Sequence, residues 1–323
     1  MVAEESHQLA CEVRDVDLAP VDADDVLVAV EYSSVNFKDA MVASAPSRVR
    51  RVASLVGGVD AAGVVEASSI DGFKVGELVA VHGGNLGVAR DGGFATHVYA
   101  PARYLSALPA PLSARDAMVL GTAGFTAMAS VLALEDRGLV AGARVVVSGA
   151  TGGVGSQSVH FLAVRGYQPV ASTGSADHAE WLRELGAVEV IGRDELSDLP
   201  GRVLGTERWD GAIDSVGGAA LASILRSLRY GAAVAASGLV ASAELDTTLY
   251  PFITRGVALL GIDAVEANPS TRARVWRAVA EIAPRVDFAR LVDRVVTLEQ
   301  LPEALEDIRR GATRGRILVR PTP

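Results

Sequence analysis

The sequence Arg144-Val-Val-Val-Ser-Gly-Ala-Thr-Gly-Gly-Val-Gly155 joins strand-favouring residues to a glycine-rich turn, and a helical pattern begins near Ser156. Glycines suit such a turn because they tolerate positive φ and let backbone N–H groups approach a pyrophosphate at a helix N-terminus. The spacing G-x-x-G-G-x-G differs from the common G-x-G-x-x-G, and glycine-rich turns also serve as plain connectors. The stretch therefore predicts dinucleotide binding, with a plain connector as the alternative.

Strands alternate with helical patterns around this turn. This alternation predicts an α/β fold, a Rossmann doubly wound parallel sheet whose first βα unit contains the glycine turn. We expect this dinucleotide-binding domain at residues 118–254, with residues 257–262 as a candidate last strand. The other expected strands lie at 145–148, 169–172, 211–215 and 232–237.

The chain outside this region shows a different pattern, with short strands separated by turn-prone residues, which is typical of a β-rich domain. The C-terminal strand 315–320 is too isolated to stand alone, so it should pair with this domain. Residues 1–117 and 255–323 are therefore predicted to form a second, catalytic domain. Its first strands are expected at 25–32, 61–65, 78–81 and 95–98.

Composition favours soluble small-molecule chemistry. Of 323 residues 50% are hydrophobic, and the net charge is −9, which disfavours a nucleic-acid or anionic-membrane surface. The N-terminus lacks the basic start of a signal peptide, so a cytoplasmic protein is expected. The apolar residues between Leu120 and Leu134 are interrupted by Thr122 and Thr126, which predicts a buried helix and no membrane span.

No metal site is predicted. Cys11 is the only cysteine, which excludes an intramolecular disulfide and a thiolate-rich zinc site. His82 and His97 follow or begin predicted strands, and no third ligand stands at a recognisable spacing. Both histidines are expected to be structural.

The end of the second predicted strand indicates which dinucleotide binds. NAD-binding Rossmann units usually carry an acid about 20 residues after the glycines, and none occurs in Val170-Ala-Ser-Thr-Gly-Ser175. Hydroxyl groups and backbone N–H groups can accept a 2′-phosphate that a carboxylate would repel. NADP(H) is therefore favoured over NAD, with His178 or Arg193 as a cation for that phosphate. The alternative is that the hydroxyl residues here only cap the following helix.

Longer stretches of the chain, Leu120-Gly-Thr-Ala-Gly-Phe-Thr-Ala-Met128 and Pro251-Phe-Ile-Thr-Arg-Gly-Val-Ala-Leu-Leu-Gly-Ile-Asp263 above all, resemble one family. They are similar to the acrylyl-CoA reductase branch of the zinc-free medium-chain dehydrogenase/reductases, close to the quinone oxidoreductases. The resemblance runs from Ser33 to Val319. Three shorter stretches share it, namely Ala133–Asp136, Gly149–Gly155 and Gly211–Gly217.

The resemblance implies a Rossmann domain beside a GroES-like catalytic domain, in a subunit that forms a homodimer. It also implies NADPH-dependent reduction of an activated C=C bond, most directly in a short-chain enoyl thioester such as acrylyl-CoA. A quinone or enone reductase stays open as an alternative, as does a nucleotide-binding protein with little turnover. A zinc alcohol dehydrogenase is not expected, because Gly58-Val-Asp60 stands where the zinc enzymes carry Gly-His-Glu.

The resemblance also assigns site residues. Asn36 and Phe37 would lie beside the nicotinamide, and Asp39 joins them as a catalytic candidate. Phe37 stands where a Tyr is common, and Ser175 where an Arg is common. The other predicted cofactor-binding residues are Thr151, Gly152, Gly153, Val154, Gly155, Thr173, Gly174, Ser175, His178, Arg193, Leu239, Ile253, Ala264 and Arg316.

The expected chemistry is hydride addition to the β-carbon, which moves charge to the carbonyl oxygen as an enolate. Asn36 and backbone N–H groups are candidate donors to that oxygen. The α-carbon proton would come from water, Lys38 or Asp39, although the last two could equally form a salt-bridged helix start. The cluster Arg48, Arg50 and Arg51 would bind the phosphates of an acyl-CoA or form a solvated basic loop.

Overall fold

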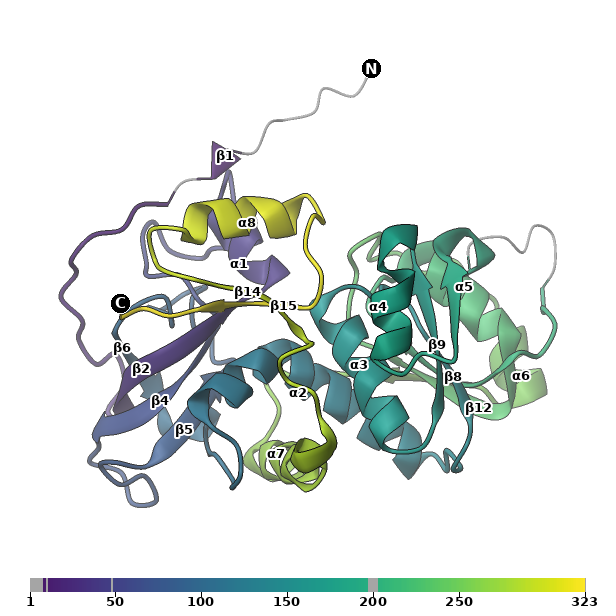
Figure 1. Cartoon of the computed structure of the whole chain (residues 1–323), viewed down its shortest axis with the longest axis horizontal. Helices are drawn as coiled ribbons and strands as arrows, with labels where there is room; N and C mark the ends of the chain where they lie inside the picture. Colours follow the sequence, from purple (N-terminus) through teal and green to yellow (C-terminus); the bar gives the residue numbers. More distant parts are fainter. Residues whose placement is uncertain (1–7, 10, 48, 197–202, 323) are drawn as a thin grey trace. The chain divides into compact units, whose positions relative to one another are not determined.

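The computed structural model describes residues 8–9, 11–47, 49–196 and 203–322, and the chain divides into two compact units (Figure 1). The first unit contains Met1–Thr122, Ala264–Ala280 and Val292–Pro323. The second contains Ala123–Asp263 and Glu281–Leu291. The predicted fold class is confirmed: the second unit has a parallel Rossmann-like sheet with helices, and the first unit is β-rich.

The second unit contains a six-stranded parallel sheet in the order β10-β9-β8-β11-β12-β13. Strand β8 has β9 on one side and β11 on the other, so the strand order reverses there, which is where such sheets bind ligands. Val145, Val146 and Val147 of β8 are fully buried, as expected for a strand covered on both faces. The strands are β8 Arg144–Val147, β9 Gln168–Thr173, β10 Glu189–Gly192, β11 Trp209–Asp214, β12 Leu228–Ala236 and β13 Ala258–Gly261.

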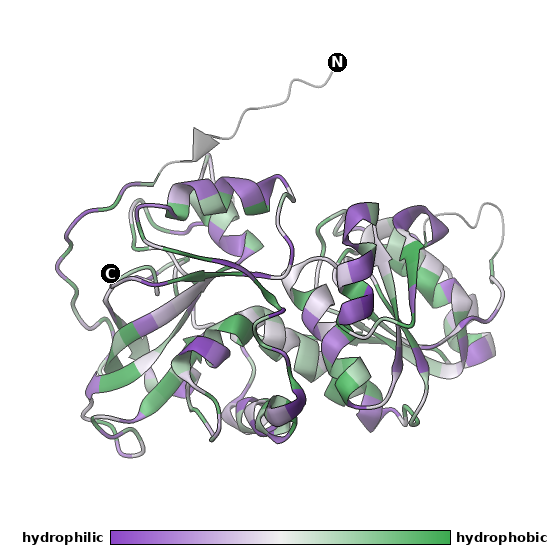
Figure 2. Ribbon diagram, in the orientation of Figure 1, coloured by the Kyte–Doolittle hydropathy of each residue, from purple (hydrophilic) through white to green (hydrophobic). Residues whose placement is uncertain are grey.

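Helices cover this sheet. Helix α3 packs against β8 and β9, α4 against β10, α5 against β11 and β12, and α6 against β12. Hydrophobic residues, green in Figure 2, gather along the strands, whereas α4 carries many hydrophilic ones. The helices are α3 Gly153–Val164, α4 Ala179–Glu184, α5 Gly218–Ser227 and α6 Tyr250–Arg255, with 3-10 helices η2 Ala176–His178 and η3 Arg193–Leu196.

The first unit contains a seven-stranded sheet in the order β14-β15-β2-β4-β5-β7, with β6 also paired to β2. The C-terminal strand β15 pairs antiparallel with β2, Ile317 opposite Val35, so it does return to this unit as predicted. Its strands are β2 Asp25–Val35, β4 Asp60–Ala67, β5 Leu78–His82, β6 His97–Pro101, β7 Leu105–Ala107, β14 Val292–Val296 and β15 Arg316–Val319. Strands β1 Gln8–Leu9 and β3 Ser44–Ala45 form a separate two-stranded antiparallel sheet.

The helices of the first unit lie beside this sheet. Helices α1 and α8 pack against each other through buried residues that include Ala40, Ala304 and Leu305. They are α1 Phe37–Ala43, α8 Leu301–Arg309 and α7 Pro269–Ile282, whose last two residues belong to the second unit, with the 3-10 helix η1 Ala102–Tyr104. The 3-10 helix η4 Ala283–Arg285 belongs to the second unit.

Helix α2, Ala114–Asp136, is interrupted at Gly121, whose φ is 53° and ψ −158°. A side chain there would be strained at this φ, and a Cβ would also meet the Asp60 carboxylate. Within the described residues, α2 is the one helix whose length and composition would allow it to cross a membrane, and 83% of its apolar window is buried inside the protein. Such burial is typical of the core helix of a folded protein.

The chain passes between the units four times, at 122/123, 263/264, 280/281 and 291/292. The expected bounds were 117/118 and 254/255 only. The second boundary lies later than expected because β13 completes the parallel sheet. Residues 281–291 belong to the second unit because they bind it through several hydrogen bonds. The Asp287 amide donates to His160 Nε2 at 3.0 Å, and Trp181 Nε1 donates to the Arg290 carbonyl at 3.1 Å.

Candidate functional site

The glycine turn lies at the carboxyl end of β8. Gly149 has a φ of 60°, and its carbonyl accepts the Gly152 amide at 3.0 Å. A Cβ on Gly155 would meet that same carbonyl, so the close approach of the turn to α3 requires glycine. Gly152 is the N-cap of α3, and no side chain caps the helix. The first-turn amides are thus left for an anion, which fits a pyrophosphate.

The end of β9 supplies the neighbouring part of the site. Thr173 is buried and accepts the Ser175 amide at 3.0 Å, whereas Gly174 and Ser175 are exposed. Gly192 of β10 pairs with Thr173, which brings Arg193 beside Gly174. A Cβ on Gly174 would meet the Arg193 guanidinium. The structure therefore gathers a cation, hydroxyl groups and free backbone at the place expected for a 2′-phosphate.

The alternative role of these hydroxyl residues was helix capping. Ser175 is the N-cap of η2, yet its side chain makes no capping hydrogen bond. His178 ends η2, half-buried, with its ring edge-on to Trp181 at 6.3 Å between centroids. Thr173 stabilises the turn itself, so Ser175 is left available to a ligand.

The remaining predicted cofactor residues fall in both units. Thr151, Gly153 and Val154 are half-buried in the glycine turn and the first turn of α3. Leu239 and Ile253 are 62% and 73% exposed, on the loop after β12 and on α6. Ala264 and Arg316 belong to the first unit and are buried there.

A surface cavity of about 180 Å³ lies at the opposite, amino-terminal edge of the parallel sheet. Arg137, Ala143 and Tyr230 are among its lining residues, and none of the predicted site residues lines it. It is separate from the glycine turn.

A buried polar cluster surrounds Asn36 in the first unit. The fully buried Asp60 accepts hydrogen bonds from Ser34 Oγ at 2.6 Å, Asn36 Nδ2 at 2.9 Å and Thr122 Oγ1 at 2.6 Å. Arg316 donates to Ser34 Oγ at 2.6 Å and to Asn36 Oδ1 at 3.2 Å. Both ends of the Asn36 amide are thereby fixed. Arg316 is 2% exposed and serves here to orient Asn36.

Asp39 lies in the first turn of α1, 3% exposed. Its Oδ2 accepts the Asn36 amide at 2.7 Å and its Oδ1 accepts the Val59 amide at 3.0 Å. Burial, and secondarily the charge of Asp60, raise the pKa of Asp39 from 3.8 to about 7. Among the described residues Asp39 forms no ion pair, so it does not make the salt-bridged helix start considered above. Phe37 and Lys38 beside it are exposed.

His82 and His97 do not converge. His82 is 1% exposed, and Arg272 donates to its carbonyl at 3.1 Å. Burial, and then the charge of Arg272, lower the pKa of His82 to about 3. His97 lies on the surface, with Nε2 2.8 Å from Glu66.

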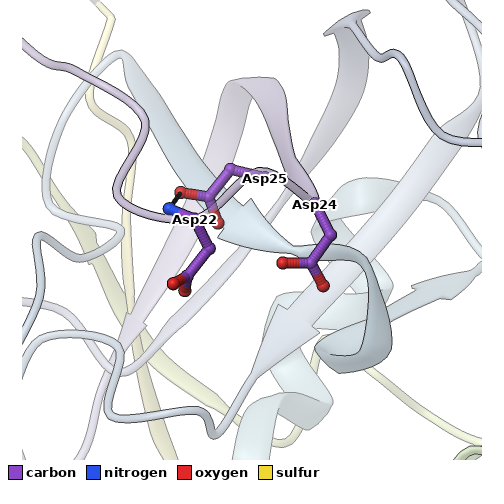
Figure 3. Close-up of side chains that lie close together, drawn as sticks. All are labelled: Asp22, Asp24 and Asp25. Carbon is purple, nitrogen blue, oxygen red and sulfur yellow. Dashed lines mark hydrogen bonds between the residues drawn. The ribbon is translucent and has the colours of Figure 1, made fainter.

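In the described part of the chain, one acidic cluster has the proximity expected of metal ligands, namely Asp22, Asp24 and Asp25, drawn in Figure 3. Arg90 binds two of its members, at 2.9 Å from Asp22 and 2.6 Å from Asp25. Asp25 also accepts the amides of Val21 and Asp22. These contacts explain the cluster as an anchor for the start of β2.

Known proteins match the chain along most of its length. The profile of the alcohol dehydrogenase GroES-like domain matches residues 22–110, and that of the zinc-binding dehydrogenase matches residues 153–281. Acrylyl-CoA reductase AcuI of Ruegeria pomeroyi is 42% identical over 317 residues, which cover 98% of this chain and 96% of that protein.

Solved structures agree with these matches. The yhdH oxidoreductase from Salmonella enterica in complex with NADP is 39% identical, with a TM-score of 0.92 over 96% of this chain and 95% of that one. Bacillus subtilis protein yhfP with NAD bound is 44% identical, with a TM-score of 0.90 over 93% and 92%. At these identities and coverages, the chain belongs to the medium-chain dehydrogenase/reductase family, in its acrylyl-CoA reductase-like branch.

Proposed function

We propose that the chain is an NADPH-dependent reductase of an activated C=C bond, most directly that of a short-chain enoyl thioester such as acrylyl-CoA. The observation that carries the cofactor assignment is the Arg193 guanidinium lying against Gly174 at the end of β9, where NAD-binding units place an acid. The relative named for acrylyl-CoA and the solved relative in complex with NADP support the same function.

In this proposal the second unit holds the dinucleotide and the first holds the reacting group. The uncapped α3 terminus binds the pyrophosphate, while Thr173, Ser175 and Arg193 bind the 2′-phosphate. The bound nicotinamide supplies the hydride. Because both Asn36 N–H groups already donate, to Asp60 and to the Ser34 carbonyl at 3.2 Å, Asn36 shapes the loop that presents Phe37.

The α-carbon proton then comes from solvent or Lys38. Asp39 is buried with each oxygen accepting a backbone amide, whereas Lys38 is exposed. We also propose that no zinc takes part, because Val59 stands where the zinc enzymes carry their His and Asp60 where they carry their Glu, and the oxygens of Asp60 already accept hydrogen bonds from Ser34, Asn36 and Thr122.

The cofactor assignment is tested by replacing Arg193. We expect Arg193→Ala to weaken NADPH binding by roughly 10- to 100-fold, as for loss of a charge-assisted hydrogen bond, and to leave NADH binding unchanged. Arg137→Ala, at the opposite edge of the sheet, is the matched control. Titration by nucleotide fluorescence measures all four constants. Equal losses for NADPH and NADH in Arg193→Ala would contradict the assignment.

The substrate class is tested by following NADPH oxidation with acrylyl-CoA, crotonyl-CoA and a simple quinone in parallel. Turnover of the thioesters at low concentration supports the proposal. Turnover of the quinone alone would replace it with the quinone reductase alternative, which shares the cofactor site and which the Phe37 ring, lacking a hydroxyl, also suits.

Arg50 and Arg51 are proposed to bind the phosphates of the acyl-CoA. Their side chains form no hydrogen bond or ion pair with other residues in the described part of the chain, and Arg51 is exposed. Arg48, the third member of this sequence cluster, lies outside the described residues. We expect Arg50→Ala/Arg51→Ala to raise the KM for acrylyl-CoA about tenfold and to leave the KM for a quinone unchanged. Lys74→Ala, which removes one exposed positive charge elsewhere, is the control, and an unchanged acrylyl-CoA KM would assign the pair to a solvated loop.

A further inference from the structure

A single carboxylate joins the ends of neighbouring strands at the nucleotide edge of the parallel sheet. Asp214 is the last residue of β11 and is fully buried. Its Oδ1 accepts the Ser148 hydroxyl at 2.6 Å, and its Oδ2 accepts the Gly217 amide at 2.8 Å. Ser148 follows β8 and directly precedes Gly149. The carboxylate therefore connects the start of the glycine turn to the turn after β11.

Further hydrogen bonds extend this connection to β12. Ser215 donates its amide to Ser148 Oγ at 3.2 Å and its hydroxyl to the Ser148 carbonyl at 3.2 Å. The Asp214 carbonyl accepts the Ser237 amide at 2.9 Å, just before the loop that contains Leu239. The three strand ends and their turns thus form one hydrogen-bonded group, which we call the Asp214 network.

Two glycines pack against this network so closely that neither position has space for a side chain. A Cβ on Gly149 would lie 2.8 Å from Ser215 Oγ. A Cβ on Gly238 would meet the Ser215 carbonyl. A displacement of Ser148 would therefore shift Gly149, whose carbonyl binds the Gly152 amide at the N-cap of α3.

The burial of the Asp214 carboxylate is energetically unfavourable. Asp214 forms no ion pair within the described residues, and burial raises its pKa. Burying an unpaired carboxylate is unfavourable unless hydrogen-bond donors satisfy it, and here hydroxyl and amide groups do so. A neutral residue would close the turn with a smaller desolvation penalty. The carboxylate therefore indicates that the two turns must be held in a precise geometry.

We propose that Asp214, acting through Ser148, is a positioning residue for the dinucleotide: it fixes the glycine turn in the geometry that presents the α3 amides to the pyrophosphate. This inference rests on the proposed function, since it assumes that NADPH binds at the turn. Asp214 does not touch the cofactor in this assignment. Substitution of Asp214 should therefore weaken the binding of NADPH and leave the rate of the chemical step unchanged.

The test uses Ser148→Ala and Asp214→Asn in the full chain. Asparagine keeps the shape of Asp214 but turns an amide N–H toward one of two donors, so one hydrogen bond is lost. We expect each variant to raise the Kd for NADPH about tenfold, the double variant to raise it little further, and kcat at saturating NADPH to stay unchanged.

The matched control is Asp210→Asn, at the other end of the same strand. Asp210 accepts the Arg144 amide at 2.8 Å and pairs with Arg229 at 2.5 Å, so its loss should lower the Tm without changing the Kd. Network variants that lose Tm like Asp210→Asn but keep the wild-type Kd would show a merely structural role and overturn the inference. If Asp214→Asn does not fold, Ser148→Ala decides alone. Failure of the wild-type chain to bind NADPH would refute the proposed function instead.

Discussion

Burial of Asp39 determines the pH range over which this residue stabilises the fold. The unfolded chain releases this proton near pH 3.8, whereas the folded chain holds it until about pH 7. Between these values the folded state binds more protons, so the contribution of Asp39 to stability is present at low pH and is lost as pH rises through 7. Two accepted amide hydrogen bonds oppose the shift but do not outweigh burial.

The Asp39→Asn variant tests this window. Asparagine cannot accept both amides as Asp39 does, so we expect the variant to lose about 1–3 kcal/mol of unfolding free energy at pH 5. The difference in unfolding free energy between the wild type and the variant should be smaller at pH 8, because only the wild type then carries a buried charge. Urea unfolding at both pH values measures the difference. A loss that is constant across pH would show that Asp39 has an ordinary pKa.

At this scale the sequence predicts residues in local motifs and misses those whose partners are distant. Asn36, Thr173 and Arg193 could be identified from motif position. Ser34 forms hydrogen bonds with Asp60, 26 positions away in the sequence, and with Arg316, 282 positions away. No periodicity or spacing signals such contacts. The first depends on the pairing of β4 with β2, and the second on the return of β15 to pair with β2.

Among the elements, the βα units around the glycine turn are the most readily predicted, because their valine-rich strands and apolar helices are strongly periodic. The sequence does not predict the short strands β1, β3, β7, β10 and β14. In β10 and β14, the charged residues Glu189, Asp293 and Arg294 interrupt the apolar pattern. Missing β10 matters for the site, since its pairing with β9 is what brings Arg193 to Gly174.

The turn from β8 to α3 predicts a strict requirement for glycine. We expect Gly155→Ala to abolish measurable NADPH binding, because its Cβ would meet the Gly149 carbonyl and push the turn away from α3. Gly261→Ala on β13 is the control, since a Cβ there has open space. Calorimetric titration with NADPH compares the two. Wild-type affinity in Gly155→Ala would show that the turn adapts.

Across the whole molecule, two neutral histidines make the fold sensitive to acid. Burial, and then Arg272, lower the pKa of His82 to about 3, and burial lowers the pKa of His160, near which Asp287 and Arg290 also lie. The unfolded chain takes up these protons near pH 6.5, so stability is lost as pH falls below that value. Asp39 and Asp214, whose pKa values burial raises, act in the opposite direction, so the contribution of the histidines is measured as a difference between the wild type and a variant without them.

We therefore expect the double variant His82→Asn/His160→Asn to be less stable than the wild type at pH 7.5, because it loses hydrogen bonds to buried groups, and this difference in Tm to shrink between pH 6.5 and pH 4.5. Differential scanning calorimetry across this range provides the comparison. His97→Asn is the control, since that ring lies on the surface. A difference in Tm that stays constant on acidification would contradict the lowered pKa values of the two histidines.

The fourfold passage of the chain between the units determines how this protein can be recombined with its relatives. A chimera that grafts only residues 123–263 onto another scaffold would omit residues 281–291. His160 would then lack the Asp287 amide, and Trp181 would lack the Arg290 carbonyl. A graft of the nucleotide unit therefore needs four junctions, and swaps of cofactor preference in this branch should carry both segments together.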